Sequence, residues 1–487
     1  MYRLALCTRY VMSRFLTLVA TVAVFLAVGV LVVVMAVMGG FTREVRSALR
    51  GGLSDVIIAT DVSGMAHYDE FIAEIKKHPN VAEATPVIQL FGLVRLEPQG
   101  YGSTITKPCF IFGVHPGPMS RVVSRFGEYL ERQKQFPDRE PTFDLPADVA
   151  QKMQGQGTRT YAGCIPGSEL VSYVVRDDDE EAGGGLRKPT DGGVPRPEVM
   201  LLTGVGAKVV VTTLPVTASG RLGREGLGAG VMPVARPYTV VDHYKSRLFE
   251  FDSRYLFIPF EEAQKLGELG DLSGTDPEDP PRAHQVQVSL RDYGQAEQTV
   301  RDLRAVWRSF ASQRVLLWPK EVTIRTWEQE KATTLSIYQM QFVMTMILLS
   351  LVMLVAGFLI GAILTMIVKE KTRDIGILKC LGASNVGVAQ IFLFYAVMVS
   401  SVGALLGLLA GKYFIFKIDT IEAFLSRVLG IDVFPRAGYF FDSIPRYEDP
   451  WLQALVVAGA IFWAVLCGTI AAWRASRLQP VEALRYE

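Results

Sequence analysis

The stretch Val368–Ser384, VKEKTRDIGILKCLGAS, decides how this sequence is interpreted. Six charged residues stand within its first twelve positions. On each side lies an uncharged apolar run that is long enough to cross a bilayer, which takes about 20 residues. A short charged helix between two spans either contacts a partner at the membrane surface or only fixes the orientation of the spans. The spacing of its residues fits both interpretations.

The bulk composition is that of a membrane protein with a large water-soluble part. The chain has 487 residues, 49% of them hydrophobic, and a net charge of +1. This balance gives no indication of nucleic-acid binding. The five histidines show no HExxH or paired spacing, so we expect no metal site.

Four segments are predicted to span the membrane: residues 15–38, 342–368, 386–410 and 451–473. The first is too long for a signal peptide and is interpreted as an uncleaved anchor. Lysine and arginine gather before the first span, between the second and third, and after the fourth. Because cytoplasmic segments are enriched in these residues, we expect both termini in the cytoplasm.

The predicted fold class is an α-helical membrane protein with four transmembrane helices and a large extracytoplasmic α+β domain between helices 1 and 2. Residues 1–42 form the cytoplasmic N-terminus and first span, residues 43–334 the domain, and residues 335–487 the remaining membrane part. Within the domain, β-branched and aromatic runs such as KVVVTT and QVQVSL predict strands. Two amphipathic stretches, YDEFIAEIKKHP and DYGQAEQTVRDLRAVWRSF, predict helices, and we expect two lobes.

Two stretches of the domain are predicted to be loops. Residues 176–197 are acidic and rich in glycine and proline, which indicates a solvated linker; a calcium site is the alternative. Residues 214–237 lie between two predicted strands and are interpreted as a protruding hairpin.

Cys109 and Cys164 both belong to the predicted domain, and no CxxC pair occurs in the chain. Two unpaired core cysteines and a disulfide are both compatible with the sequence, and the former is the favoured interpretation. In the third span, Gly403, Gly407 and Gly411 share one helical face, where small residues let a second helix approach closely.

No motif for catalysis is present. The chain has no GxxxxGK[ST] phosphate loop and no GxSxG elbow, and its predicted spans carry no charged residues. We therefore expect a non-catalytic protein that works by conformational movement, with the energy supplied by another chain. Residues 369–384 are then a handle for that chain: Ile375, Leu378 and Leu381 at three-residue spacing predict an apolar ridge on a helix. The remaining candidates around the ridge are Lys369, Glu370, Lys371, Arg373, Asp374, Gly376, Lys379 and Gly382, the last also suited to a helix C-cap.

The same stretches resemble a known family. The chain is similar, nearly end to end, to the permease subunit of the lipoprotein-releasing ABC transporters, within a superfamily that includes macrolide-efflux and cell-division permeases. Residues 368–384 match the superfamily's coupling segment, and WRASRLQPVEALRYE matches its C-terminus. FEFDSRYLFIPFEEAQ and FFDSIP are more specific to the lipoprotein-releasing branch. The insertion at 176–197, the expanded stretch 117–161 and the missing asparagine near Phe358 depart from the family pattern.

The resemblance implies a set of partners. Two permease chains, identical or paralogous, would bind two ATPase subunits at their coupling helices, and ATP and Mg²⁺ would be bound by those subunits. A lipoprotein would enter from the membrane and pass to a periplasmic carrier. The carrier-docking hook of the family matches residues 214–237, which implies roles for Leu214, Pro215, Arg221, Arg224, Met232 and Pro233; a variable loop without a partner is the alternative.

Two other functions fit parts of the sequence. One is an efflux permease that works with a periplasmic adaptor, and the other is a signalling permease that activates a cell-wall hydrolase. The outer-loop stretches argue against the first. The size of the predicted domain argues against the second, because division-type permeases have a much smaller outer domain.

Overall fold

The computed structural model divides into two compact units. The membrane unit contains residues up to Glu44, Ser336–Val433 and the residues from Asp442, and the α+β domain contains Val45–Leu335. The described residues are 15–97, 104–136, 139–155, 159–174, 199–201, 203–215, 233–246, 248–270, 280–313, 322–429 and 444–477.

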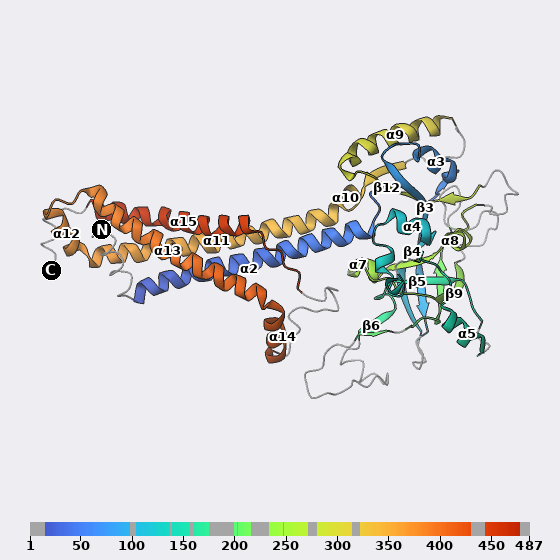
Figure 1. Cartoon of the computed structure of the whole chain (residues 1–487), viewed down its shortest axis with the longest axis horizontal. Coiled ribbons are helices and arrows are strands. Elements are labelled where there is room, and N and C mark those ends of the chain that lie inside the picture. Colours follow the sequence, from blue (N-terminus) through green and yellow to red (C-terminus); the bar gives the residue numbers. More distant parts are fainter. Residues whose placement is uncertain are drawn as a thin grey trace. The chain divides into compact units, whose positions relative to one another are not determined.

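Four helices of the described chain are long and apolar enough to cross a membrane (Figure 1). They are α2 (Phe15–Gly52), α11 (Ala332–Glu370), α13 (Asn385–Phe416) and α15 (Pro450–Ser476). All four predicted spans lie inside them, and α2 and α11 continue well beyond the apolar stretches. The predicted fold class, four such helices with an α+β domain between the first and the second, is confirmed.

The close contact between α2 and α13 depends on the glycines of α13. A Cβ atom at Gly403 would lie 2.8 Å from the Thr21 carbonyl oxygen, and one at Gly407 would lie 2.6 Å from that of Phe25. At Gly411 the nearest atom would be the Gly29 carbonyl oxygen at 3.2 Å. Backbone therefore lies against backbone along this face, as expected where small residues line a helix pair.

The order of these contacts fixes the directions of the helices. Partners of α13 advance along α2 as the sequence advances, so the two helices run parallel. At their N-terminal ends, the Thr17 and Tyr395 hydroxyls are hydrogen-bonded at 2.6 Å. The Lys379 Nζ atom, between α11 and α13, donates to the carbonyl of Ser476 at the C-terminal end of α15 (2.7 Å). The N-terminus of α2 and the C-terminus of α15 thus belong to the same end of the bundle.

The opposite end of the bundle is tied by the segment before α15. The Tyr447 N–H donates to the Ala36 carbonyl of α2 at 2.9 Å, and the Arg43 guanidinium lies over the Tyr447 ring at 4.5 Å. Arg446 Nη1 donates to the Ile415 carbonyl at 3.0 Å, in the last turn of α13. Because the last carbonyls of a helix have no partner within it, this arginine caps α13.

The glycine contacts generate a test of the packing. We expect Gly407→Ala to lower the free energy of unfolding of the membrane unit by about 1–3 kcal/mol, because the added methyl overpacks a backbone contact. Gly459→Ala is the matched control, since a Cβ there meets only the end of Met353 at 3.6 Å. Unfolding of both variants in detergent micelles measures the difference. Equal stabilities would contradict the packing.

The α+β domain is built around one nine-stranded sheet whose order is β13-β1-β12-β3-β4-β10-β5-β9-β8. The strands are β1 (Val56–Thr60), β3 (Val81–Leu96), β4 (Ile105–Val114), β5 (Gly163–Pro166), β8 (Lys208–Thr213), β9 (Val234–Val240), β10 (Tyr255–Pro259), β12 (Gln285–Leu290) and β13 (Val322–Thr326). Shorter pairs are β2 (Met65–Ala66) with β11 (Arg282–Ala283) and β6 (Ser172–Val174) with β7 (Val199–Leu201).

The long strand β3 takes part in two lobes. Its first half, Val81–Val87, pairs with β12 in an antiparallel sheet with β1 and β13. Its second half pairs with β4 and also with β8, so that β3-β4-β10-β5-β9-β8 closes into a ring. Gly92 permits the closure, because a Cβ atom there would clash with the Thr212 carbonyl oxygen.

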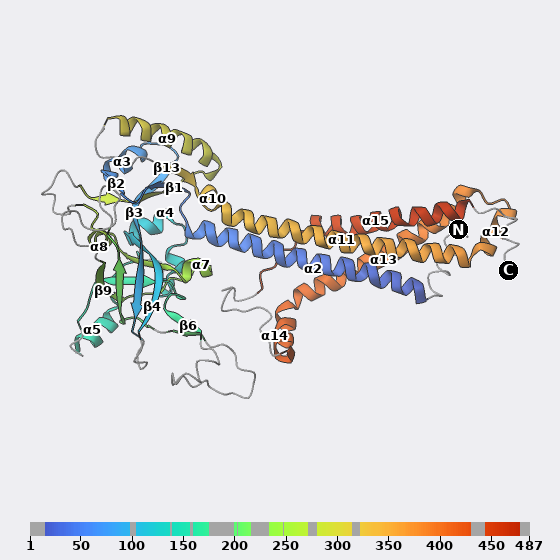
Figure 2. The ribbon, with the colours of Figure 1, turned by 180° about the vertical axis from the view of Figure 1, so that it is seen from behind.

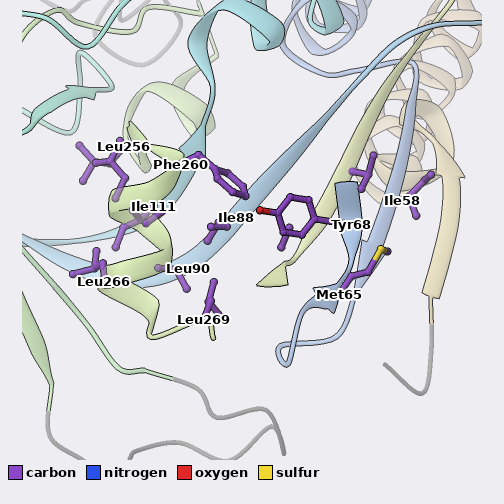
Figure 3. Close-up of a cluster of buried hydrophobic side chains, with 14 of the residues drawn as sticks. Ile58, Met65, Tyr68, Ile88, Leu90, Ile111, Leu256, Phe260, Leu266 and Leu269 are labelled. Atoms are coloured by element: carbon purple, nitrogen blue, oxygen red, sulfur yellow. The ribbon is translucent and has the colours of Figure 1, made fainter. Parts of the chain in front are cut away.

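Short helices complete the domain. They are α3 (Tyr68–Ile75), α4 (Pro116–Val122), α5 (Ala147–Gly155), α7 (Phe249–Asp252), α8 (Phe260–Gly267), α9 (Ala296–Ser312) and α10 (Trp327–Glu330). Helices α3 and α9 contact each other, and they pack against β3 and β13 respectively (Figure 2). A continuous core joins both lobes, with the rings of Tyr68 and Phe260 edge to face at 5.6 Å (Figure 3).

Cys109 on β4 and Cys164 on β5 are buried free thiols, as favoured from the sequence. Strand β10 pairs with both β4 and β5 and so separates the two cysteines. Burial raises the pKa of the Cys109 thiol to about 12 and also raises the pKa of Cys164. Neither thiol forms an appreciable amount of thiolate at neutral pH.

Thiol labelling tests this state. At pH 8 we expect a maleimide to modify the exposed Cys380 of the folded protein and to leave Cys109 and Cys164 unmodified. After denaturation without reductant, both buried cysteines become reactive, and peptide mass spectrometry assigns each site. Failure of the two to react after denaturation would indicate a disulfide.

Candidate functional site

The charged stretch between the second and third spans forms a separate short helix, α12 (Thr372–Cys380). Only Lys371 separates it from α11, and the turn Leu381–Ser384 leads into α13. Backbone bonds continue through the first junction, since Lys371 N–H donates to Ile367 (2.9 Å) and Ile375 N–H donates to Lys371 (3.0 Å). A movement of α12 is therefore carried directly into α11.

One face of α12 holds the helix onto the bundle. Ile375 is only 3% exposed and belongs to the same core as Val368 and Val388. Lys379, as described above, donates to the end of α15, where a cation is favoured by the helix dipole. Lys371 and Asp374 pair with each other at 2.8 Å. Two of the predicted coupling residues, Ile375 and Lys379, thus hold α12 on the bundle.

The other face of α12 is open. Arg373 is exposed, Ile377 is 45% exposed and Leu381 is 81% exposed, at four-residue intervals along one side of the helix. Cys380 and Val386 extend this surface, and Lys369 and Glu370 are exposed before it. We call Arg373, Ile377, Cys380, Leu381 and Val386 the exposed α12 surface.

The predicted apolar ridge of Ile375, Leu378 and Leu381 is wrong as a single contact surface. Ile375 points into the bundle, Leu378 is half-buried, and only Leu381 is exposed. Ile377, Cys380 and Val386 were not predicted. Ile377 follows Arg373 by four residues, so a four-residue spacing includes it. The periodicity alone does not say which face of the helix packs on the membrane helices.

Gly382 ends α12 in a left-handed conformation, with φ of +91°. Its N–H donates to the Lys379 carbonyl and the Ala383 N–H donates to that of Leu378, both at 3.0 Å, which forms a Schellman motif. The expected C-cap is present. A Cβ at Gly382 would meet nothing within 4 Å, so the left-handed conformation and not the available space favours glycine here. Gly376 is buried within the helix. Ser384 then caps α13 by accepting the Gly387 N–H at 3.1 Å.

At the other end of α2, the last turns of the helix are buried in the α+β domain. Val45 and Leu49 are 3% and 2% exposed. The Tyr129 hydroxyl donates to the Ala48 carbonyl at 3.4 Å, and Arg46 pairs with Glu328 of α10 at 2.5 Å. An exposed ion pair contributes little by itself, so the buried apolar contacts hold this end of the helix.

The start of α11 is fixed in the domain by the helix that precedes it. Thr326 and Gln329 form a capping box at α10, and Lys331 continues the helical hydrogen bonds into α11. The backbone N–H of Trp327 donates to the backbone carbonyl of Asp55, and the Asp55 carboxylate accepts the backbone N–H of Leu290 at 2.8 Å. Burial raises the pKa of Asp55, although that N–H acts in the opposite direction. Helices α2 and α11 are thus each anchored in the domain by backbone and core contacts.

The predicted hairpin at 214–237 joins two paired strands. Strands β8 and β9 are antiparallel, and Thr213 pairs with Val234. Of the predicted docking residues, Leu214 and Pro233 are exposed and Pro215 is buried. Arg221, Arg224 and Met232 lie outside the described residues, as does the insertion 176–197, which joins the paired strands β6 and β7. Among described residues, no cluster of three His, Cys, Asp or Glu suits a metal ion.

The comparison with protein families identifies the C-terminal part. Residues 346–480, which include the exposed α12 surface, match the family described as FtsX-like permease C-terminal. This part of the chain is an FtsX-like permease domain. The resemblance to the permease superfamily is therefore confirmed.

Similar proteins extend beyond that domain. The chain is 23% identical over 481 residues to the lipoprotein-releasing system transmembrane protein LolC of Xylella fastidiosa (strain 9a5c), an alignment that covers 97% of this chain and 94% of that protein. It is 27% identical over 292 residues to LolC of Neisseria meningitidis serogroup B, covering 59% and 64% of the two chains. Similarity to the macrolide export ATP-binding/permease protein MacB of Syntrophobacter fumaroxidans is 28% over 169 residues, which is 35% of this chain and 21% of that one.

The Schellman turn gives a prediction for the site. We expect Gly382→Ala to destabilise the α12–α13 turn by roughly 1–2 kcal/mol, because a left-handed conformation is unfavourable for a residue with a Cβ atom. Gly382→Asn is the matched variant, because asparagine tolerates this conformation and should lose less. Unfolding in detergent micelles compares the two. Identical losses would show that the conformation of residue 382 does not limit stability.

Proposed function

We propose that this chain is the permease subunit of an ABC transporter that releases lipoproteins from the inner membrane. A separate subunit hydrolyses ATP and binds the nucleotide and Mg²⁺, and this chain converts that reaction into movement. The observation that carries the proposal is the exposed α12 surface, which offers apolar and charged groups on a helix whose opposite face is fixed to three membrane helices.

The exposed α12 surface has the composition of a contact for another protein. Ile377 and Leu381 are apolar side chains open to solvent beside the Arg373 guanidinium. Arginine is one of the residues enriched at the energetically important positions of protein interfaces. A loop that only set membrane topology would need the positive charges but not these apolar neighbours, so the spacing favours docking of the ATPase.

The orientation in this proposal follows from charge and from the bundle. Lysine and arginine of the α11–α13 connection and after α15 belong to the same end as the start of α2. The proposal assigns this end and both termini to the cytoplasm. The α+β domain is then periplasmic, and a second permease chain, identical or paralogous, completes the membrane part.

Movement at α12 would pass to the domain along the helices α11 and α2. Helix α11 begins one residue after a capped helix of the domain and runs unbroken to Glu370, one residue before α12. Helix α2 ends in a buried turn of the same domain. A closing motion driven at the cytoplasmic end would therefore reach the domain without passing through a loop.

The substrate class is proposed from the near full-length similarity to a lipoprotein-releasing protein. Moving an acyl chain from a bilayer into water costs about 0.8 kcal/mol per CH₂ group, so a lipoprotein with several chains needs an external energy source and an apolar path. The carrier that receives it is proposed to dock on the hairpin 214–237, whose arms are the paired strands β8 and β9. Efflux through an adaptor is the competing function, supported by the shorter similarity to MacB.

One experiment tests the proposal and separates these functions. The tagged protein is purified in mild detergent from its native membrane, and co-purifying proteins are identified by mass spectrometry. An ATPase together with acylated lipoproteins supports release and names the cargo. An ATPase with an adaptor and no lipoprotein supports efflux, and a cell-wall hydrolase or its activator supports signalling.

A charge reversal on the exposed α12 surface sharpens the experiment. We expect Arg373→Glu to weaken ATPase binding by about 2 kcal/mol or more, roughly thirtyfold in affinity, because an interface cation is lost. Arg474→Glu is the matched control, since Arg474 is an exposed arginine at the same end of the bundle but lies outside this surface. Normal ATPase recovery with Arg373→Glu, or equal losses in both variants, would refute docking here.

A further inference from the structure

Helix α14 (Ile418–Leu429), which was not predicted, follows the third span directly. Only Lys417 stands between the end of α13 and the start of α14, and the hydrogen-bonding continues across it, since the Ile421 N–H donates to the Lys417 carbonyl at 2.9 Å. In both views of the chain, α14 turns away from α13 and runs crosswise to it (Figures 1 and 2). Helix α14 therefore starts at the level where a membrane span ends.

The two faces of α14 differ in polarity. Phe424 and Val428 lie one turn apart and are each 63% exposed, with Leu425 beside them. Asp419 and Glu422 occupy the other side of the helix. A helix with an exposed apolar face and a polar opposite face is typical of segments that lie in the surface of a bilayer. In water alone, exposure of Phe424 and Val428 on one face would not stabilise the helix.

Neighbouring residues mark the same level as a membrane surface. Tyr413 and Phe416 at the end of α13 and Trp451 at the start of α15 are large exposed aromatic side chains. Aromatic residues are enriched where membrane spans enter the headgroup layer. Lys412 and Lys417 interrupt the apolar sequence at this point, so the apolar core of the bilayer ends here.

The beginning of α14 is held at this level by contacts within the membrane unit. The Asp419 carboxylate accepts the Ile444 N–H at 3.1 Å. Arg446, two residues later, donates to the last turn of α13, and Tyr447 is bonded to α2. Ile418 is buried at this junction. The start of α14 is thus held in place by these contacts, and Phe424, Leu425 and Val428 project from the helix beyond it.

We infer that α14 lies along the outer surface of the phospholipid bilayer, with Phe424, Leu425 and Val428 inserted among the acyl chains. The occupant of its apolar face is the lipid surface itself, because the helix begins one residue after a span, at the level of the aromatic side chains, and runs crosswise to that span. This position fixes the depth of the periplasmic ends of α13 and α15. The inference concerns the bilayer and is independent of the transported substrate.

The test uses spin labels on the full-length chain in nanodiscs of phosphatidylethanolamine and phosphatidylglycerol. Phe424→Cys and Glu422→Cys place labels on opposite faces, because two residues along an α-helix correspond to a rotation of about 200°. Both are made in a chain that carries Cys7→Ser and Cys380→Ser. The same chain without either new cysteine gives the background from the buried thiols. Power saturation then compares collisions with oxygen, which concentrates in lipid, and with a water-soluble nickel complex.

The inference predicts that the label at residue 424 favours oxygen and that the label at residue 422 favours nickel. Val428→Cys repeats the apolar-face measurement if Phe424→Cys disturbs folding. Nickel access at both 424 and 428 equal to that at 422 would overturn the inference, because α14 would then stand in water. Loss of both oxygen and nickel access on the apolar face would also overturn it, because protein would then cover that face.

Discussion

Backbone contact between α2 and α13 is the constraint on which the membrane unit depends. The two helices approach along Gly403, Gly407 and Gly411 until a single added carbon would meet a carbonyl oxygen. No hydrophobic effect drives helices together within lipid, so such close packing supplies much of their association. It also sets the helices parallel, so that the N-terminal ends of both belong to the end of the bundle that carries α12.

The α12 helix depends on that arrangement. A helix this short has little stability of its own, and α12 is kept in place by the buried Ile375, by Lys379 at the end of α15 and by the left-handed turn at Gly382. These groups hold one face of α12 on the bundle, and the opposite face is open to solvent. A partner that bound the open face would act on a surface held in place by these contacts.

Much of this was accessible from the sequence because the signals are local. Apolar length identified the four spans, and the glycine period identified the packing face of α13. The C-cap at Gly382 also followed from a single residue type. The buried side of α12 did not, because Leu381 belongs both to a three-residue series with Ile375 and to a four-residue series with Ile377. Packing against α13 and α15 decides between them. The closure of the ring in the domain likewise depends on β3 meeting β8, more than a hundred residues later.

The parallel pairing of α2 with α13 has a consequence for how the chain is made. The partner face for α2 is translated only after the whole α+β domain, so α2 must remain in the bilayer alone during that time. At about 5–20 residues per second, translating some 300 residues takes roughly 15–60 seconds. The most apolar 18-residue window of α2 has a mean hydropathy of 3.0, which suits a helix that stays in the bilayer before its partner is made. Biogenesis, as well as transport, therefore constrains the composition of the first span.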